Sequence, residues 1–142
     1  MRFQLFFGHL FTLIIGGLIY VLFRVESLKM FKFFDLFSIG YQIDKIRVYT
    51  IPYSEYLPNW FLFSLPDGLW IFSYTSLVLY IWKNKLKKEN IFWVLIVPFI
   101  SIFSEIGQIF NIIPGTFDLI DLIFYLMGFL LPFFLYEIKI VN

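Results

Sequence analysis

Four long apolar stretches dominate this sequence and leave few folds open to it. They run from about residue 3 to 23, 65 to 82, 91 to 110 and 117 to 136. Each approaches the length of about 20 helical residues that crosses the hydrocarbon core of a bilayer, which is about 30 Å thick. A helix also satisfies its own backbone polar groups, as the bilayer interior requires. The pattern therefore predicts an all-α, polytopic membrane protein built as a bundle of four transmembrane helices.

The composition agrees with a single integral membrane domain over residues 1–142. Hydrophobic residues make up 61% of the chain and aromatic residues 24%, well above the usual range for a soluble domain. A formal net charge of only +1 gives no reason to expect a nucleic-acid partner. The chain has no cysteine and a single histidine, His9. Disulfides, thiol nucleophiles and zinc sites built from several imidazoles are therefore excluded.

One short loop predicts how the chain is threaded through the membrane. Residues 83–90 (KNKLKKEN), between the second and third apolar stretches, contain four lysines. Short basic loops of this kind stay on the cytoplasmic side. We therefore expect both termini in the cytoplasm. Residues 24–64 and the turn at Pro114 and Gly115 should then lie on the outer side.

The long segment between the first and second spans, residues 24–64, is not an ordinary hydrophilic loop. Residues 27–41 alternate aromatic and charged side chains, which suits a helix lying at the membrane surface. Residues 46–63 are rich in Tyr, Trp and Pro, which favours an irregular or partly extended stretch at headgroup depth. We expect an interfacial segment, and leave open whether it is a surface helix, a lid or a contact between copies.

Two of the predicted helices begin with residues that could cap them. Ser64, Pro66 and Asp67 match a capping box at the start of the second span. The fourth span opens with Thr116 or Asp118 in the capping position. Asp67 and Asp118 are therefore expected to be caps more often than catalysts.

Several polar side chains fall at a similar depth near the outer ends of three spans, although ionisable groups inside a membrane are costly. Glu105 and Gln108 come in the last turns of the third span, where the helix dipole disfavours negative charge. Asp121 lies one turn inside the fourth span. The group comprises Asp67, Glu105, Gln108, Asp118 and Asp121. Their depth predicts one acidic pocket near the outer leaflet.

Arg24, at the outer end of the first span, is the cation expected at matching depth. Three interpretations of the acids stay open: an ion pair with Arg24, a bound divalent cation, or a carboxyl that acts as a proton donor. In an enzyme, Arg24 could also hold a phosphate. The candidate site residues are, for catalysis, Glu105, Asp118 and Asp121 and, for binding, Arg24, Asp67 and Gln108.

Part of this pattern resembles the carboxy-terminal motif of the VanZ-like family of small bacterial membrane proteins. The likeness covers Ser104 to Gly128 and consists of Glu105-x-x-Gln108, Pro114-Gly115, Asp118-x-x-Asp121 and Gly128. This chain has Thr116 and Tyr125 where the family usually has Arg and Asn. The resemblance implies a bundle of four or five helices in the bacterial cytoplasmic membrane. It also implies that Glu105, Gln108, Asp118 and Asp121 form the polar site; the family's molecular activity is not established.

The predicted pocket suits an envelope lipid or a lipid-linked glycan, which the protein would bind or modify. The depth of the acids fits a headgroup, and the aromatic residues 49–63 could cover an acyl chain or a sugar. Whether the protein is an enzyme stays open. The alternative is a small self-assembling membrane protein or accessory subunit, a homo-oligomer that could line a pore. The apolar runs at residues 78–82 and 130–135 argue mildly against a channel, and the absence of a repeated half argues against a transporter.

Overall fold

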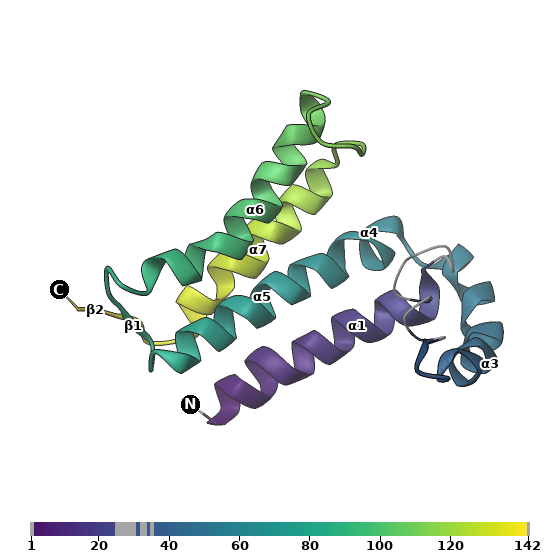
Figure 1. Ribbon diagram of the computed structural model, residues 1–142, viewed down its shortest axis with the longest axis horizontal. Helices are drawn as coiled ribbons and strands as arrows, with labels where there is room; N and C mark the ends of the chain where they lie inside the picture. Colours follow the sequence, from purple (N-terminus) through teal and green to yellow (C-terminus); the bar gives the residue numbers. More distant parts are fainter. Residues whose placement is uncertain (1, 25–30, 32–33, 35, 142) are drawn as a thin grey trace.

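A computed structural model shows a mostly helical chain whose long helices lie side by side (Figure 1). The structure describes residues 2–24, 31, 34 and 36–141. The long elements are η1 (Gln4–Phe11), which continues directly into α1 (Thr12–Phe23), then α5 (Ser64–Ile81), α6 (Ile91–Ile109) and α7 (Leu119–Leu135). The predicted bounds of all four apolar helices are confirmed to within two residues.

Two helices in the described part of the chain are long and apolar enough to cross a membrane. They are the η1–α1 rod, Gln4–Phe23, and α6. Only 17% of the most apolar 18-residue window of each is buried inside the protein, which differs from the mostly buried core helix of a soluble domain. α7 is apolar but shorter, with 17 residues. These features support a membrane protein, whereas the arrangement with four spans remains a proposal.

α5 is the central helix of the bundle and contacts η1, α1, α6 and α7. Its closest approach is to α7, because a Cβ atom on Gly128 would lie 2.3 Å from the carbonyl oxygen of Gly68. A Cβ atom on Gly16 would likewise lie 2.8 Å from Nε1 of Trp70, so α1 also packs on α5 through a glycine. Gly16 thus has a packing role, whereas a Cβ atom on Gly17 would meet nothing within 4 Å.

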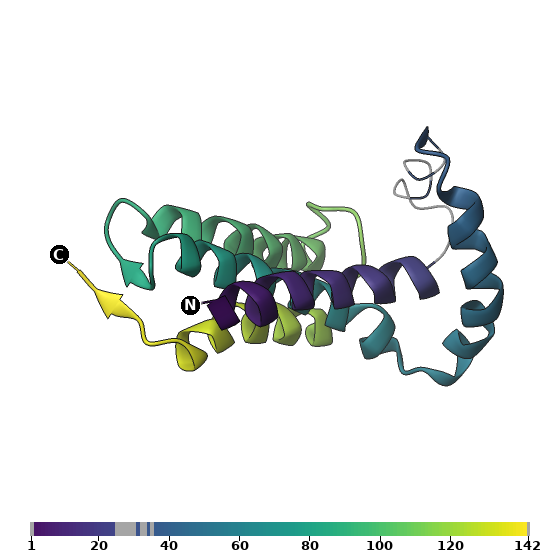
Figure 2. The ribbon, with the colours of Figure 1, turned by 90° about the horizontal axis from the view of Figure 1, so that it is seen from below.

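Both described ends of the chain lie at the same end of the bundle as the basic loop (Figures 1 and 2). Within this loop, the strand β1 (Lys85–Leu86) pairs in parallel with β2 (Lys139–Ile140), which follows α7. Asn90 closes the loop: its amide accepts from the Lys87 N–H at 2.8 Å and donates to the Lys85 carbonyl at 2.7 Å. The sequence did not predict this pairing, because both strands have only two residues.

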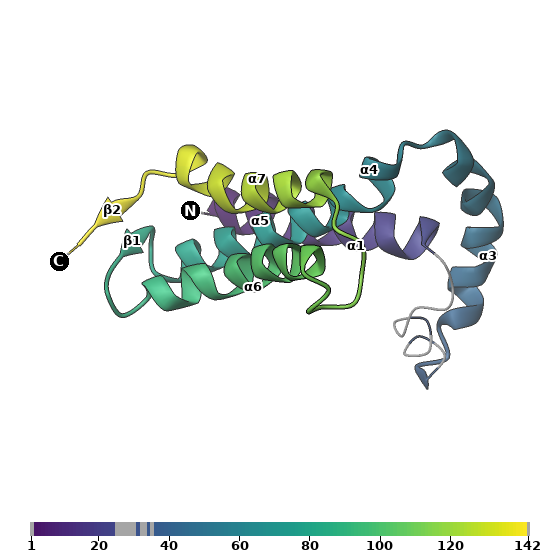
Figure 3. The ribbon, with the colours of Figure 1, turned by 90° about the horizontal axis from the view of Figure 1, so that it is seen from above.

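The segment between the first and second long helices is more helical than predicted. α3 (Gly40–Thr50) runs into the 3-10 helix η2 (Ile51–Tyr56), and the short α4 (Asn59–Leu62) then leads into α5. Figures 2 and 3 show α3 set apart from the bundle, beyond the end of α1. The expectation of an irregular or extended stretch over residues 46–63 was therefore wrong. Seven of the fifteen residues of the surface helix expected over residues 27–41 lie outside the described residues.

Arg47 of α3 attaches this segment to the end of α1. Its guanidinium is buried, with the residue 1% exposed, and donates to the carbonyl of Val21 and, at 2.7 Å, to that of Arg24. The Thr50 hydroxyl donates to the Leu22 carbonyl at 2.9 Å. The last carbonyls of a helix have no partner within it, so these bonds act as a C-terminal cap supplied by another helix.

The helix cap predicted at Asp118 is formed, whereas the one predicted at Ser64 is not. Asp118 caps α7, because its Oδ1 accepts a hydrogen bond from the Ile120 N–H at 2.8 Å. Ser64 does not cap α5: Phe63 holds the N-cap position without a side-chain hydrogen bond, and Ser64 is buried in the first turn. The reason is that α4 immediately precedes α5, so the chain is already helical where the cap was expected.

Candidate functional site

Three carboxylates from three helices come together at the end of the bundle away from the termini. Asp67 lies in the first turn of α5, Glu105 near the end of α6 and Asp121 in the first turn of α7. Glu105 and Asp121 are both close enough to act electrostatically on Asp67. All three also act on the hydroxyl of Tyr125 in α7. The structure thus gathers side chains that are far apart in the sequence into one acidic cluster.

A pocket of about 300 Å³ opens beside this cluster, between α5, α6 and α7. The Tyr125 hydroxyl lies 3.5 Å from Oδ2 of Asp67, to which it donates a long hydrogen bond. The Ser101 hydroxyl also lines the pocket and donates to the Val97 carbonyl at 3.1 Å. The full lining is Asp67, Trp70, Ile71, Val97, Ser101 and Tyr125. One carboxylate, two hydroxyls and one indole therefore face a small cavity with otherwise aliphatic walls.

Glu105 connects α6 to the turn that enters α7. It is 2% exposed, and its Oε1 accepts a hydrogen bond from the Asp118 N–H at 2.6 Å. Its Oε2 accepts a longer bond, 3.4 Å, from the Gln108 amide. A Cβ atom on Gly115, whose φ is +144°, would lie 2.8 Å from the Gln108 side chain. Glu105 and Gln108 therefore hold the turn in place, and Gly115 lets the backbone approach them.

Asp121 differs from the other acids of the cluster. Its Oδ1 is buried and has no hydrogen-bond partner among the residues that the structure describes. Buried polar atoms without a partner are rare in folded proteins, and each calls for an explanation. An acceptor that no described group satisfies is what a ligand with a hydroxyl or amino group would use.

Two partners were predicted for the acids, the Arg24 side chain and a divalent cation, and the structure describes the surroundings of both. The Arg24 guanidinium lies over the rings of Phe63 and Tyr20, at 4.5 and 5.1 Å from their centroids. It is close enough to attract Asp67, but among the described residues no ion pair joins it to an acid of the cluster. Within residues 2–24, 31, 34 and 36–141, no three acidic or histidine side chains are grouped as a metal site requires.

Sequence reasoning missed Ser101 and Tyr125 as lining residues, although the helical repeat contains the signal. Ser101 precedes Glu105 by four residues and Tyr125 follows Asp121 by four, so each shares a helix face with an acid. Trp70 was missed because a single indole in an apolar span is usually a lipid-facing or interfacial side chain.

No protein-family model, curated protein or solved structure matches this chain. The resemblance of residues 104–128 to the VanZ-like motif is therefore neither supported nor contradicted by relatives.

Proposed function

We propose that this chain is a multi-pass protein of the bacterial cytoplasmic membrane, with four spans and cytoplasmic termini. Its acidic pocket, near the outer leaflet, binds the polar part of an envelope lipid or a lipid-linked glycan. The observation that carries the proposal is that Asp67, Glu105 and Asp121, from three different helices, lie within electrostatic range of Tyr125, whose hydroxyl donates to Asp67. Ionisable groups gathered inside a membrane bundle mark functional sites by default.

The outer surface of the bundle supports the membrane part of the proposal. Large apolar side chains lie on the outside of the helices, such as Ile100 at 63%, Phe103 at 61% and Phe134 at 80% exposed. Soluble proteins rarely expose apolar area on this scale, whereas lipid chains cover it at no cost. The basic loop beside both termini supports their placement in the cytoplasm.

The chemistry of the pocket supports a ligand with hydroxyl or amino groups. Asp67 can accept hydrogen bonds, and the hydroxyls of Ser101 and Tyr125 can both donate and accept. The indole of Trp70 offers a flat apolar face of the kind against which a sugar ring packs. Because carboxylates repel a phosphate, the sugar or amine of a headgroup would enter this pocket and its phosphate would stay outside.

If the protein also carries out a reaction, the hydrogen bonds that the acids already make limit which carboxylate can act as the general acid or base. Both oxygens of Glu105 and one oxygen of Asp118 are engaged with backbone or amide groups that hold the turn. Asp67 and Asp121 are less engaged, so the role of general acid or base falls to one of them. Glu105 and Asp118 then position the site rather than act on the ligand.

The test is native mass spectrometry of the protein released from the membranes in which it is made. We expect the wild type to carry a lipid or a lipid-linked glycan that Asp67→Asn and Tyr125→Phe both lose. Asp44→Asn is the control, because Asp44 lies exposed on α3, away from the pocket. A wild-type protein without such a mass, or an adduct that both pocket variants keep, would overturn the proposal. The same spectra test the alternative, since a large ligand-free ring would favour a self-assembling protein.

A further inference from the structure

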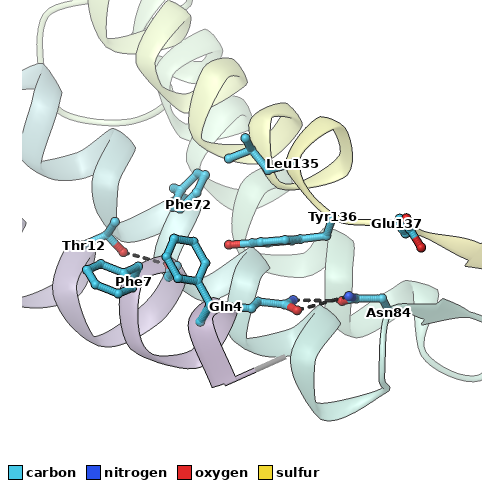
Figure 4. A pocket seen from close by; sticks show the side chains of 10 residues that line it. Gln4, Phe7, Thr12, Phe72, Asn84, Leu135, Tyr136 and Glu137 are labelled. Atoms are coloured by element: carbon cyan, nitrogen blue, oxygen red, sulfur yellow. Dashed lines mark hydrogen bonds between the residues drawn. The ribbon is translucent and has the colours of Figure 1, made fainter.

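A second cavity, of about 470 Å³, lies at the opposite end of the bundle from the acidic pocket. It is enclosed by η1, by α5 and by the end of α7 (Figure 4). Most of its polar lining lies at the end nearest the termini and comes from Gln4, Asn84, Tyr136 and Glu137, while Phe7, Thr12, Phe72 and Leu135 line the remainder. The cavity is therefore polar at the end nearest the termini, here called its mouth, and mostly apolar along the helices.

The polar mouth is a built structure with fixed side chains. Gln4 is 3% exposed and exchanges two hydrogen bonds with the Asn84 amide, at 2.8 and 3.1 Å. Gln4 also donates to the Ser76 carbonyl at 3.1 Å. The Tyr136 hydroxyl lies 3.2 Å from Oγ of Ser76 and is close to Gly8, where a Cβ atom would come within 2.1 Å of it. These contacts hold η1, α5 and the end of α7 in fixed positions around the mouth.

A neighbouring cavity, of about 120 Å³, lies along α5 and α7, shares Phe72 with the 470 Å³ cavity and has an entirely apolar lining that reaches Leu65 and Phe124. The two cavities together are here called the groove. Leu131 lines the inner cavity and Leu135 the outer one, and their spacing of four places them on one face of α7. From Tyr136 to Phe124 the groove covers about 18 Å of helix, more than half of the bilayer core of about 30 Å. An acyl chain from one leaflet is long enough to fill a groove of this length.

The charges around the mouth complement a zwitterionic headgroup. Glu137 lies at this end of the cavity and is exposed, so its carboxylate is free to turn toward an ammonium group beside the mouth. Lys139 follows Glu137 by two residues, and Arg2 precedes Phe3, another lining residue. In a headgroup with a phosphate and a primary amine, the phosphate is attracted by the basic residues and the amine by Glu137. A purely anionic headgroup would instead be repelled by Glu137.

We infer that the groove from Glu137 and the Gln4–Asn84 pair to Leu65 binds one phospholipid with a phosphate and a primary amine in its headgroup, as in phosphatidylethanolamine. One acyl chain lies along Phe72 and Leu131, and the amine meets Glu137. This lipid belongs to the leaflet at the end of the bundle that holds the termini. Its site shares no residue with the acidic pocket, so the two sites can be tested independently.

The test uses vesicles with equal amounts of phosphatidylethanolamine and phosphatidylglycerol, from which the full chain is released into a mass spectrometer. We expect the wild type to retain one phosphatidylethanolamine in preference to phosphatidylglycerol. Glu137→Gln should lower that preference about two- to fivefold, the range for an exposed ion pair. Glu89→Gln is the matched control, because Glu89 is exposed in the basic loop and does not line the cavity. Asp67→Asn should leave the preference unchanged.

Two tryptophan substitutions on α7 test the groove itself. Leu131 lines it and is 40% exposed, whereas its neighbour Leu130 is 45% exposed and does not line it. Leu131→Trp should fill the groove and abolish retention of both lipids, while Leu130→Trp should retain them as the wild type does. No retained lipid in the wild type, an unchanged preference in Glu137→Gln, or equal losses in the two tryptophan variants would each overturn the inference.

Discussion

The carboxylate of Glu105 accepts a hydrogen bond from the backbone N–H of Asp118 at 2.6 Å, and so joins the end of α6 to the start of α7. Asp118 in turn uses its own carboxylate to cap α7. The two acids therefore work in sequence, one holding the backbone of the other, and the turn between the helices depends on both.

Removing the Glu105 carboxylate should destabilise the protein. Glu105→Ala removes the acceptor of the Asp118 N–H, and a hydrogen bond to a charged group contributes about 1.5–3 kcal/mol. Glu105→Gln keeps an acceptor oxygen and should lose less. Thermal unfolding in detergent measures the difference, with Glu89→Ala, on an exposed glutamate, as the control. Equal unfolding temperatures for Glu105→Ala and the control would contradict this role.

A methyl group at position 128 should force α5 and α7 apart. Gly128→Ala places a Cβ atom 2.3 Å from the Gly68 carbonyl oxygen, and overpacking of this kind costs about 1–3 kcal/mol. Gly17→Ala is the matched control, because a Cβ atom there meets nothing within 4 Å. The free energy of unfolding should fall for the first variant and stay level or rise for the second. If both variants unfold alike, the contact between α5 and α7 is looser than described.

Removing the Arg47 guanidinium should release α3 from α1. Arg47→Met keeps much of the side-chain length but loses the donors to the carbonyls of Val21 and Arg24. Hydrogen bonds from charged groups contribute about 1.5–3 kcal/mol each, so the loss should be large. Hydrogen exchange should become faster in α3 and at the end of α1. The control is Lys45→Met, on an exposed lysine of the same helix; comparable acceleration there would show that α3 is held by other contacts.

The proposed threading can be tested with single cysteines, since the chain has none of its own. Asn59 and Glu89 are both exposed and lie near opposite ends of α5. A maleimide that does not cross membranes, applied to intact cells, should label Asn59→Cys and spare Glu89→Cys. Asn84 is a poor position for this purpose, because its amide is bonded to Gln4. Labelling of Glu89→Cys from outside would invert the threading and both leaflet assignments.

The positions of the long helices could be predicted from the sequence because length and hydropathy alone define them. The cap at Asp118 was also predictable, since it depends on residues close in the chain. Ser64 looked equally suited to capping, but α4 ends just before it, and no local pattern announces a four-residue helix at Asn59–Leu62. The same limit explains why helix was missed in residues 46–63, where Pro52 fits the first turn of a helix as well as a loop.

Parts of both candidate sites lay beyond sequence reasoning because they depend on contacts between distant segments. Gln4 and Asn84 are 80 residues apart, and nothing near either one indicates the amide pair that they form. Asp67, Glu105 and Asp121 could be placed at a common depth, but only the fold shows that all three lie within electrostatic range of Tyr125. Arg24 was expected to pair with the acids because it lies at the same depth, but its guanidinium lies over aromatic rings. Depth in the membrane alone cannot distinguish an ion pair from a cation–π contact.

The pairing of β1 with β2 carries a consequence for how the protein is made. β2 follows α7, so β1 in the basic loop at Lys85 cannot find its parallel partner until α7 has been synthesised. The chain from α5 to β2 then closes on itself, with the Glu105 bond at one end and the strand pair at the other. The strand pair that completes this part of the bundle can therefore form only once α7 and β2 have both been synthesised.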